Sequence, residues 1–167
     1  MLFFNQYTRA MEILFKLIGL FLSIALIMMV FITSMEVVRR YVFGLSFMWA
    51  EELVKFLLVG VTFIGGAGAF RAKGMAMLDL LTTNLSGKTK KVIDFINNFI
   101  IVLLCSFLSV QGFSYSFSPM VSLMKSPGLK LNMSVAYITI PIGFALIVLF
   151  ALELILLDIK KIKKGEE

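Results

Sequence analysis

Four long runs without a charged side chain constrain the fold of this chain more than any other feature. They cover Leu17–Met35, Phe56–Phe70, Phe95–Met124 and Leu131–Leu152. As a helix, the first run alone would be roughly 28 Å long, close to the ~30 Å hydrocarbon core of a bilayer. Apolar residues make up 60% of the chain and charged residues 16%, against about 45–50% and about 25% in soluble domains. This composition excludes an ordinary soluble enzyme and indicates an integral membrane protein.

The runs predict an all-α integral membrane protein of one domain (1–167), with four transmembrane helices and additional interfacial amphipathic helices. Strands of a transmembrane barrel need only ~10 residues of alternating hydrophobicity, whereas these runs are continuous and longer. We expect the spans at about 13–38, 53–70, 92–117 and 135–157. The parts between them are an interfacial segment (1–12), an amphipathic loop (71–91) and a loop with two prolines (118–134).

The basic residues predict the orientation of the chain in the membrane. Four spans place both termini and residues 71–91 on one side, and that side carries about twice as many Lys and Arg residues as the other. Because basic loops stay in the cytoplasm, we expect this side to be cytoplasmic and residues 39–52 and 118–134 to lie outside. The net charge of +6 therefore reflects membrane orientation rather than binding to nucleic acid.

The sequence also lacks the residues that several membrane functions need. It has no histidine and a single cysteine, Cys105. Membrane anchors that bind haem usually ligate the iron through His, and a lone cysteine forms no internal disulfide. The carboxylates nearest to the middle of a span are Glu36 and Glu153, and neither is central. This counts against a proton-coupled exporter, which needs an ionisable group near the bilayer centre.

Charged residues near the ends of the first and fourth spans are candidates for pairing. Lys16 and Glu153 lie at similar depth near the inner ends of these spans, which suggests an interhelical pair. The alternative is that Lys16 pairs within its own helix with Glu12 while Glu153 reaches toward water. The sequence does not separate these two arrangements.

The first outer loop is flanked by further charges. Arg39 and Arg40 follow Glu36 at the spacing of neighbours on a helix, so we expect local structural pairs there. Glu51 and Glu52 open the second span, where carboxylates favour a helix N-terminus, and Lys55 follows Glu51 at i+4. A second reading, compatible with the first, is a hairpin network of these two carboxylates with Arg39 and Arg40.

Small and aromatic residues complete the pattern. Small residues that recur at helical spacing predict close helix packing: they are Gly65 and Gly68 in the second span and Cys105, Ser109, Gly112 and Ser116 in the third. Pro141 should kink or loosen the fourth helix. Aromatic residues at the outer membrane interface predict an interfacial belt, formed by Tyr41, Phe43, Phe47, Trp49 and Tyr137.

Residues 40–53, RYVFGLSFMWAEEL, resemble the small membrane subunit of the tripartite ATP-independent periplasmic (TRAP) transporters. That family shows Arg-Tyr-x-Phe, then Ser, Trp and Glu-Glu, and a Thr-Phe-x-Gly motif that corresponds here to Thr62–Gly65. A basic stretch with glycine that ends in Asp corresponds to Arg71–Asp79, and Tyr-x-x-x-Pro-x-Gly corresponds to Tyr137–Gly143. The resemblance covers about residues 36–155.

Two positions depart from the family pattern. They are Met75, where the family often has His, and Gly44, where it often has Asn.

The resemblance implies a multi-pass subunit of the bacterial inner membrane that is not an enzyme and carries no cofactor. It implies a large membrane subunit that carries sodium and substrate, and a periplasmic binding protein that delivers an organic acid such as a dicarboxylate or sialic acid. Membrane lipids are its other expected partners. The alternative function is a self-contained four-span exporter or channel.

Overall fold

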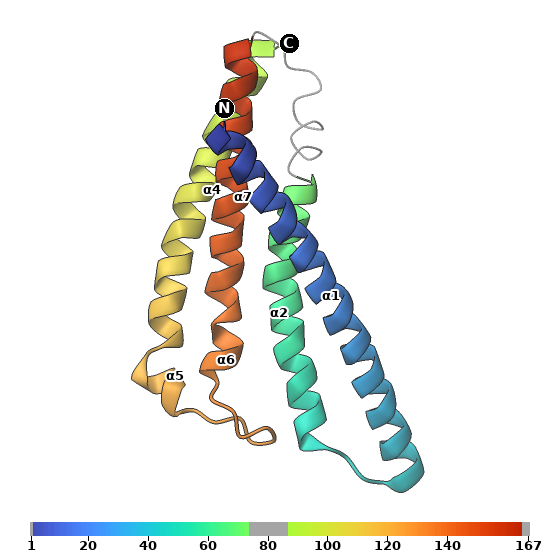
Figure 1. Cartoon of the computed structure of the whole chain (residues 1–167). Coiled ribbons are helices and arrows are strands. Elements are labelled where there is room, and N and C mark those ends of the chain that lie inside the picture. Colours follow the sequence, from blue (N-terminus) through green and yellow to red (C-terminus); the bar gives the residue numbers. More distant parts are fainter. Residues whose placement is uncertain (1, 74–86, 165–167) are drawn as a thin grey trace.

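The computed structural model describes residues 2–73 and 87–164, and the described residues form mainly long helices (Figure 1). The four long helices are α1 (Leu2–Phe43), α2 (Met48–Lys73), α4 (Gly87–Ser116) and α7 (Thr139–Lys164). Two short helices, α5 (Pro119–Leu123) and α6 (Ser134–Tyr137), lie between α4 and α7. Four segments are long and apolar enough to cross a membrane: Gln6–Phe43, Met48–Ala72, Phe95–Ser116 and Ser134–Leu156. The predicted all-α membrane fold with four spans is confirmed.

The helix boundaries refine the sequence-based expectations. The interfacial segment expected at 1–12 and the first span form one continuous helix from Leu2 to Phe43. Pro141 lies in the first turn of α7, directly after the break at Ile138 that separates α6 from α7. A proline is tolerated in a first turn because the N–H that it lacks would have no helical partner there. Most of the predicted amphipathic loop at 71–91, including Met75 and Asp79, lies outside the described residues.

The four long helices are arranged side by side rather than around a common centre (Figure 1). Helix α4 packs on α7, α7 packs on α2, and α2 packs on α1, while α1 makes a smaller contact with α7. We call the end where α1 begins and α7 ends the terminal end, and the opposite end, with residues 44–47 and 117–133, the loop end. In this layer, 33% of the most apolar window of the fourth span is buried, but only 11% of that of the first. Helix α7 is therefore the best covered helix, and α1 lies at an edge.

Close backbone approach holds the layer together. A Cβ atom on Gly143 of α7 would lie 2.7 Å from the carbonyl oxygen of Phe63 on α2. On the other side of α7, a Cβ on Gly112 of α4 would lie 3.0 Å from the Cβ of Pro141, and the Ser109 hydroxyl donates to the Pro141 carbonyl at 3.1 Å. Helices in lipid gain little from the hydrophobic effect, so such close contacts supply much of their association.

We predict that Gly143→Ala weakens the fold because the new methyl group meets backbone atoms of α2, which cannot move away locally. Overpacking of this kind costs about 1–3 kcal/mol. Gly66→Ala is the matched control, since a Cβ on Gly66 of α2 would meet nothing within 4 Å and helix propensity alone should stabilise this variant by up to ~1 kcal/mol. Thermal unfolding of the purified chain in detergent measures both. Equal midpoints for the two variants would contradict the close approach of α7 to α2.

Candidate functional site

A largely buried ion pair joins α2 to α7 at the terminal end. The Arg71 guanidinium contacts both carboxylate oxygens of Glu153, with Nε to Oε2 and Nη2 to Oε1 both at 2.8 Å. The two side chains are 18% and 5% exposed. This forked geometry is the strong form of an arginine–carboxylate contact. The same guanidinium lies 5.1 Å from the ring centroid of Phe15 on α1 and 5.5 Å from that of Phe150 on α7.

Helix α1 is also tied directly to α7 beside this pair. The Tyr7 hydroxyl donates a hydrogen bond of 2.9 Å to the Leu149 carbonyl. Around these polar contacts lies an apolar core drawn from three helices, with Met11 and Ile18 on α1, Ala67 on α2 and Phe150 on α7. We call Tyr7, Arg71, Glu153 and these core residues the terminal cluster. It is where α1, α2 and α7 converge.

Neither sequence-based arrangement for Glu153 is correct. Its partner is Arg71 rather than Lys16, which is exposed on α1. Glu153 also does not reach toward water, since the residue is 4% exposed. The prediction failed because the sequence gives the depth of a charge in a span but not the direction in which its helix faces. From the sequence, Arg71 is a basic residue at the inner end of the second span and part of a family motif, and neither feature predicts a carboxylate partner.

At the loop end, Glu36 organises the connection from α1 to α2. Its Oε1 accepts a 2.6 Å hydrogen bond from the Ser46 hydroxyl and one of 3.0 Å from the Phe47 N–H. Gly44 has φ +66°, a left-handed conformation that glycine adopts without a steric penalty. The Arg39 guanidinium lies 3.2 Å from the centroid of the Phe47 ring. The carboxylate of Glu36 therefore fixes the turn through a hydroxyl and a backbone N–H.

Glu52 fastens a second loop to the start of α2. Its Oε2 accepts hydrogen bonds from the Ser126 hydroxyl and, at 2.9 Å each, from the N–H groups of Gly128 and Leu129. These residues belong to a compact turn over residues 124–133, which we call the outer hairpin. Its two sides are joined by hydrogen bonds from Ser126 N–H to the Leu131 carbonyl and from Met133 N–H to the Met124 carbonyl.

The outer hairpin lies directly against α2. A Cβ on Gly128 would come within 2.7 Å of the carbonyl carbon of Met48, the first residue of α2, so only glycine fits there. The turn itself places Lys130 at φ 54°, a conformation that is uncommon for a residue with a side chain. Glu52 thus holds an irregular segment in one position over the end of the layer.

The predicted network between Arg39 or Arg40 and the carboxylates of α2 is not formed as ion pairs in the described part of the chain. Arg40 and Glu51 line the same cavity, but Glu51 pairs with Lys55 at 2.9 Å, as the i,i+4 spacing predicts. Glu52 accepts its hydrogen bonds from the outer hairpin instead. Both side chains of the Glu51–Lys55 pair are about two-thirds exposed, so this pair contributes only ~0–1 kcal/mol.

The remaining candidate residues have packing contacts. The rings of Trp49 and Phe47 lie 5.4 Å apart, and those of Tyr137 and Tyr115 lie 5.7 Å apart, joining the segment before α7 to the end of α4. Pro141 packs against α4. Among residues 2–73 and 87–164, no three His, Cys, Asp or Glu side chains are grouped so that they could hold a metal ion.

These features define a class: a multi-pass α-helical membrane protein whose spans form one layer, tied by polar contacts at its two ends. The comparison with known families is more specific. The model for tripartite ATP-independent periplasmic transporters, DctQ component, matches residues 29–161. The chain belongs to this family and is a small membrane component of a TRAP transporter. No curated protein matches the chain.

We predict that Glu52→Ala releases the outer hairpin, because two backbone N–H groups and a hydroxyl lose their charged acceptor. A charged acceptor forms stronger hydrogen bonds than a neutral one. Amide hydrogen exchange followed by mass spectrometry should show faster exchange in residues 124–133. Glu51→Ala is the control, since Glu51 pairs with exposed Lys55 rather than with the outer hairpin and its loss should leave this exchange unchanged. Unchanged exchange in Glu52→Ala would contradict the role given to Glu52.

We also predict that Arg71→Met destabilises the chain by about 3–5 kcal/mol, because it leaves the Glu153 carboxylate buried without a partner. The double variant Arg71→Met, Glu153→Leu removes both charges and should recover most of the loss. Thermal unfolding of the purified chain in detergent tests the pair. A double variant no more stable than Arg71→Met would show that this ion pair is not the source of the effect.

Proposed function

We propose that this chain is the scaffold of a sodium-coupled uptake system for organic acids of the dicarboxylate or sialic-acid type. In this proposal it anchors the large membrane subunit, which carries the sodium ions and the substrate. It also extends the outer surface on which the periplasmic binding protein docks. The system lies in the bacterial inner membrane, with the terminal end of this chain in the cytoplasm.

The observation that carries this proposal is the arrangement of the helices in one layer. In the described structure each long helix packs mainly against its neighbours in the row. A layer one helix thick encloses no path of its own, so a substrate route would have to be completed by another chain. The layer offers broad apolar faces for this, with exposed side chains along α4 such as Phe99, Leu103 and Phe107. A self-contained exporter or channel would instead need an interior lined by its own helices.

The loop end supports the proposed docking role. The α1–α2 connection and the outer hairpin lie at this end, and Glu36 and Glu52 hold them in place. The excess of basic residues at the opposite end favours a cytoplasmic position for both termini, and we therefore expect the loop end in the periplasm. A binding protein that approaches from the periplasm would therefore meet a preformed surface rather than loose loops.

Transport measured in vesicles of defined composition tests the proposal. With a sodium gradient and labelled sialic acid or a C4-dicarboxylate, we expect uptake only when this chain, the large subunit and the binding protein are all present. Glu36→Gln and Glu153→Gln should lower the amount of assembled complex, since both carboxylates hold structural contacts. The uptake that remains in these two variants should have the same sodium dependence as that of the parent complex. A shift in apparent sodium affinity at a constant amount of complex would show that this chain takes part in coupling and would contradict the scaffold function.

A further inference from the structure

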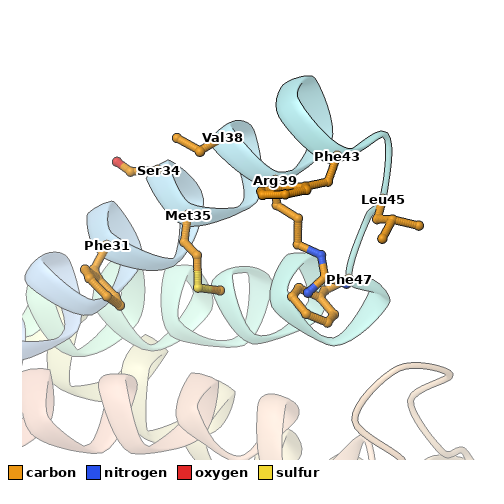
Figure 2. Close-up of a pocket in the computed structure, with 8 residues that line it drawn as sticks. All are labelled: Phe31, Ser34, Met35, Val38, Arg39, Phe43, Leu45 and Phe47. Carbon is orange, nitrogen blue, oxygen red and sulfur yellow. The ribbon is translucent and has the colours of Figure 1, made fainter.

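An apolar cleft with a single cation lies on α1 near the loop end (Figure 2). Its volume is about 630 Å³, within the range of small-molecule binding sites, ~300–1,000 Å³. Phe31, Met35 and Val38 of α1 give it an apolar lining, and Arg39 lines it together with Phe47, the residue before α2. Figure 2 shows Met35 and Arg39 pointing from α1 toward α2, with the Arg39 guanidinium beside the Phe47 ring.

Arg39 forms no ion pair in the described part of the chain, although the neighbouring Glu36 carboxylate attracts its charge. The guanidinium lies over the Phe47 ring, and its Nε is buried without a hydrogen-bond acceptor. The nearest carboxylate along the helix, Glu36, already accepts hydrogen bonds from Ser46 and from the Phe47 N–H. A guanidinium has five N–H donors, and carboxylate and phosphate oxygens are its strongest acceptors. An anionic group with several oxygen atoms would match this position.

The residues that line the cleft lie at different depths along α1. Arg39 lies four residues before the end of α1 at Phe43, which is about 6 Å along the helix axis. Phe31 lies eight residues further from the loop end than Arg39, about 12 Å deeper at the same rise. The cation is therefore near the depth at which the membrane becomes polar. Apolar lining residues lie on both sides of it, with Phe43 and Leu45 toward the loop end and Phe31 and Met35 toward the hydrocarbon core. The part on the core side can take an acyl chain of a phospholipid whose phosphate lies at Arg39.

We propose that this cleft binds one membrane phospholipid, with its phosphate on Arg39 and an acyl chain along Phe31, Met35 and Val38. A phospholipid places its phosphate at this depth, with its acyl chains on the side of the hydrocarbon core. The proposal depends on the membrane placement of the chain and not on its role in transport. The lipid site and the scaffold function can therefore be disproved independently.

Photocrosslinking in lipid nanodiscs tests this proposal on the full chain. The discs contain phosphatidylethanolamine and phosphatidylglycerol, with one probe at a time that carries a diazirine in its acyl chain. Both phospholipid probes should label residues 31–47. A diacylglycerol probe with the same acyl chain lacks the phosphate and should label this segment about tenfold less.

Two variants test separately whether lipid labelling depends on the charge of Arg39 and on the open apolar part of the cleft. Arg39→Gln removes the cation, and Val38→Trp fills the apolar part, so each should lower phospholipid labelling of residues 31–47 about tenfold. Arg40→Gln is the matched control, because Arg40 lines a different cavity and should leave the labelling within about twofold of the parent chain. Equal labelling by diacylglycerol, undiminished labelling in both cleft variants, or crosslinks from this segment to a protein subunit in place of lipid would overturn the proposal.

Discussion

The ion pair between Arg71 and Glu153 is the contact on which the arrangement of the helices depends most. It joins α2 to α7 where α1 also converges, next to the Tyr7–Leu149 hydrogen bond and under the rings of Phe15 and Phe150. Each charge would be expensive to bury alone, and the forked contact gives each the partner it needs. Because the pair has a demanding geometry, it fixes how α2 and α7 are rotated and how far each extends at this end.

At the loop end of the layer, carboxylates also hold segments together, but their partners are uncharged groups. Glu36 and Glu52 accept hydrogen bonds from backbone N–H and hydroxyl groups of the connecting segments. Between the two ends, glycines bring the backbones close together, as at Gly143 against Phe63. This combination suits helices in lipid, where packing and hydrogen bonds replace the hydrophobic effect as the source of association. The result is a layer with open apolar faces, which agrees with a subunit that works by holding another chain.

The sequence was sufficient for the features that depend on composition and local spacing. Charge-free runs predicted the four spans, the i,i+4 spacing predicted the Glu51–Lys55 pair, and the motif at 40–53 predicted the TRAP family. Contacts between distant segments were missed. The pairing of Glu153 with Arg71 depends on the rotation of α2 and α7 about their axes. Both spans have apolar residues on all sides, so their sequences do not show which side faces the neighbouring helix. The partner of Glu52 was missed because the Pro127-Gly128 pair indicates a turn but does not show against which segment that turn packs.

The mass of the assembled complex is the most direct test of the central claim that this layer of helices serves as a scaffold for a larger subunit. The chain would be tagged, expressed together with the binding protein and the large membrane component of its system, and extracted in a mild detergent for native mass spectrometry. The scaffold function predicts that each copy of this chain is recovered with one copy of the large component. Recovery as an assembly of identical copies, with the large component present in the membrane but absent from the complex, would contradict it.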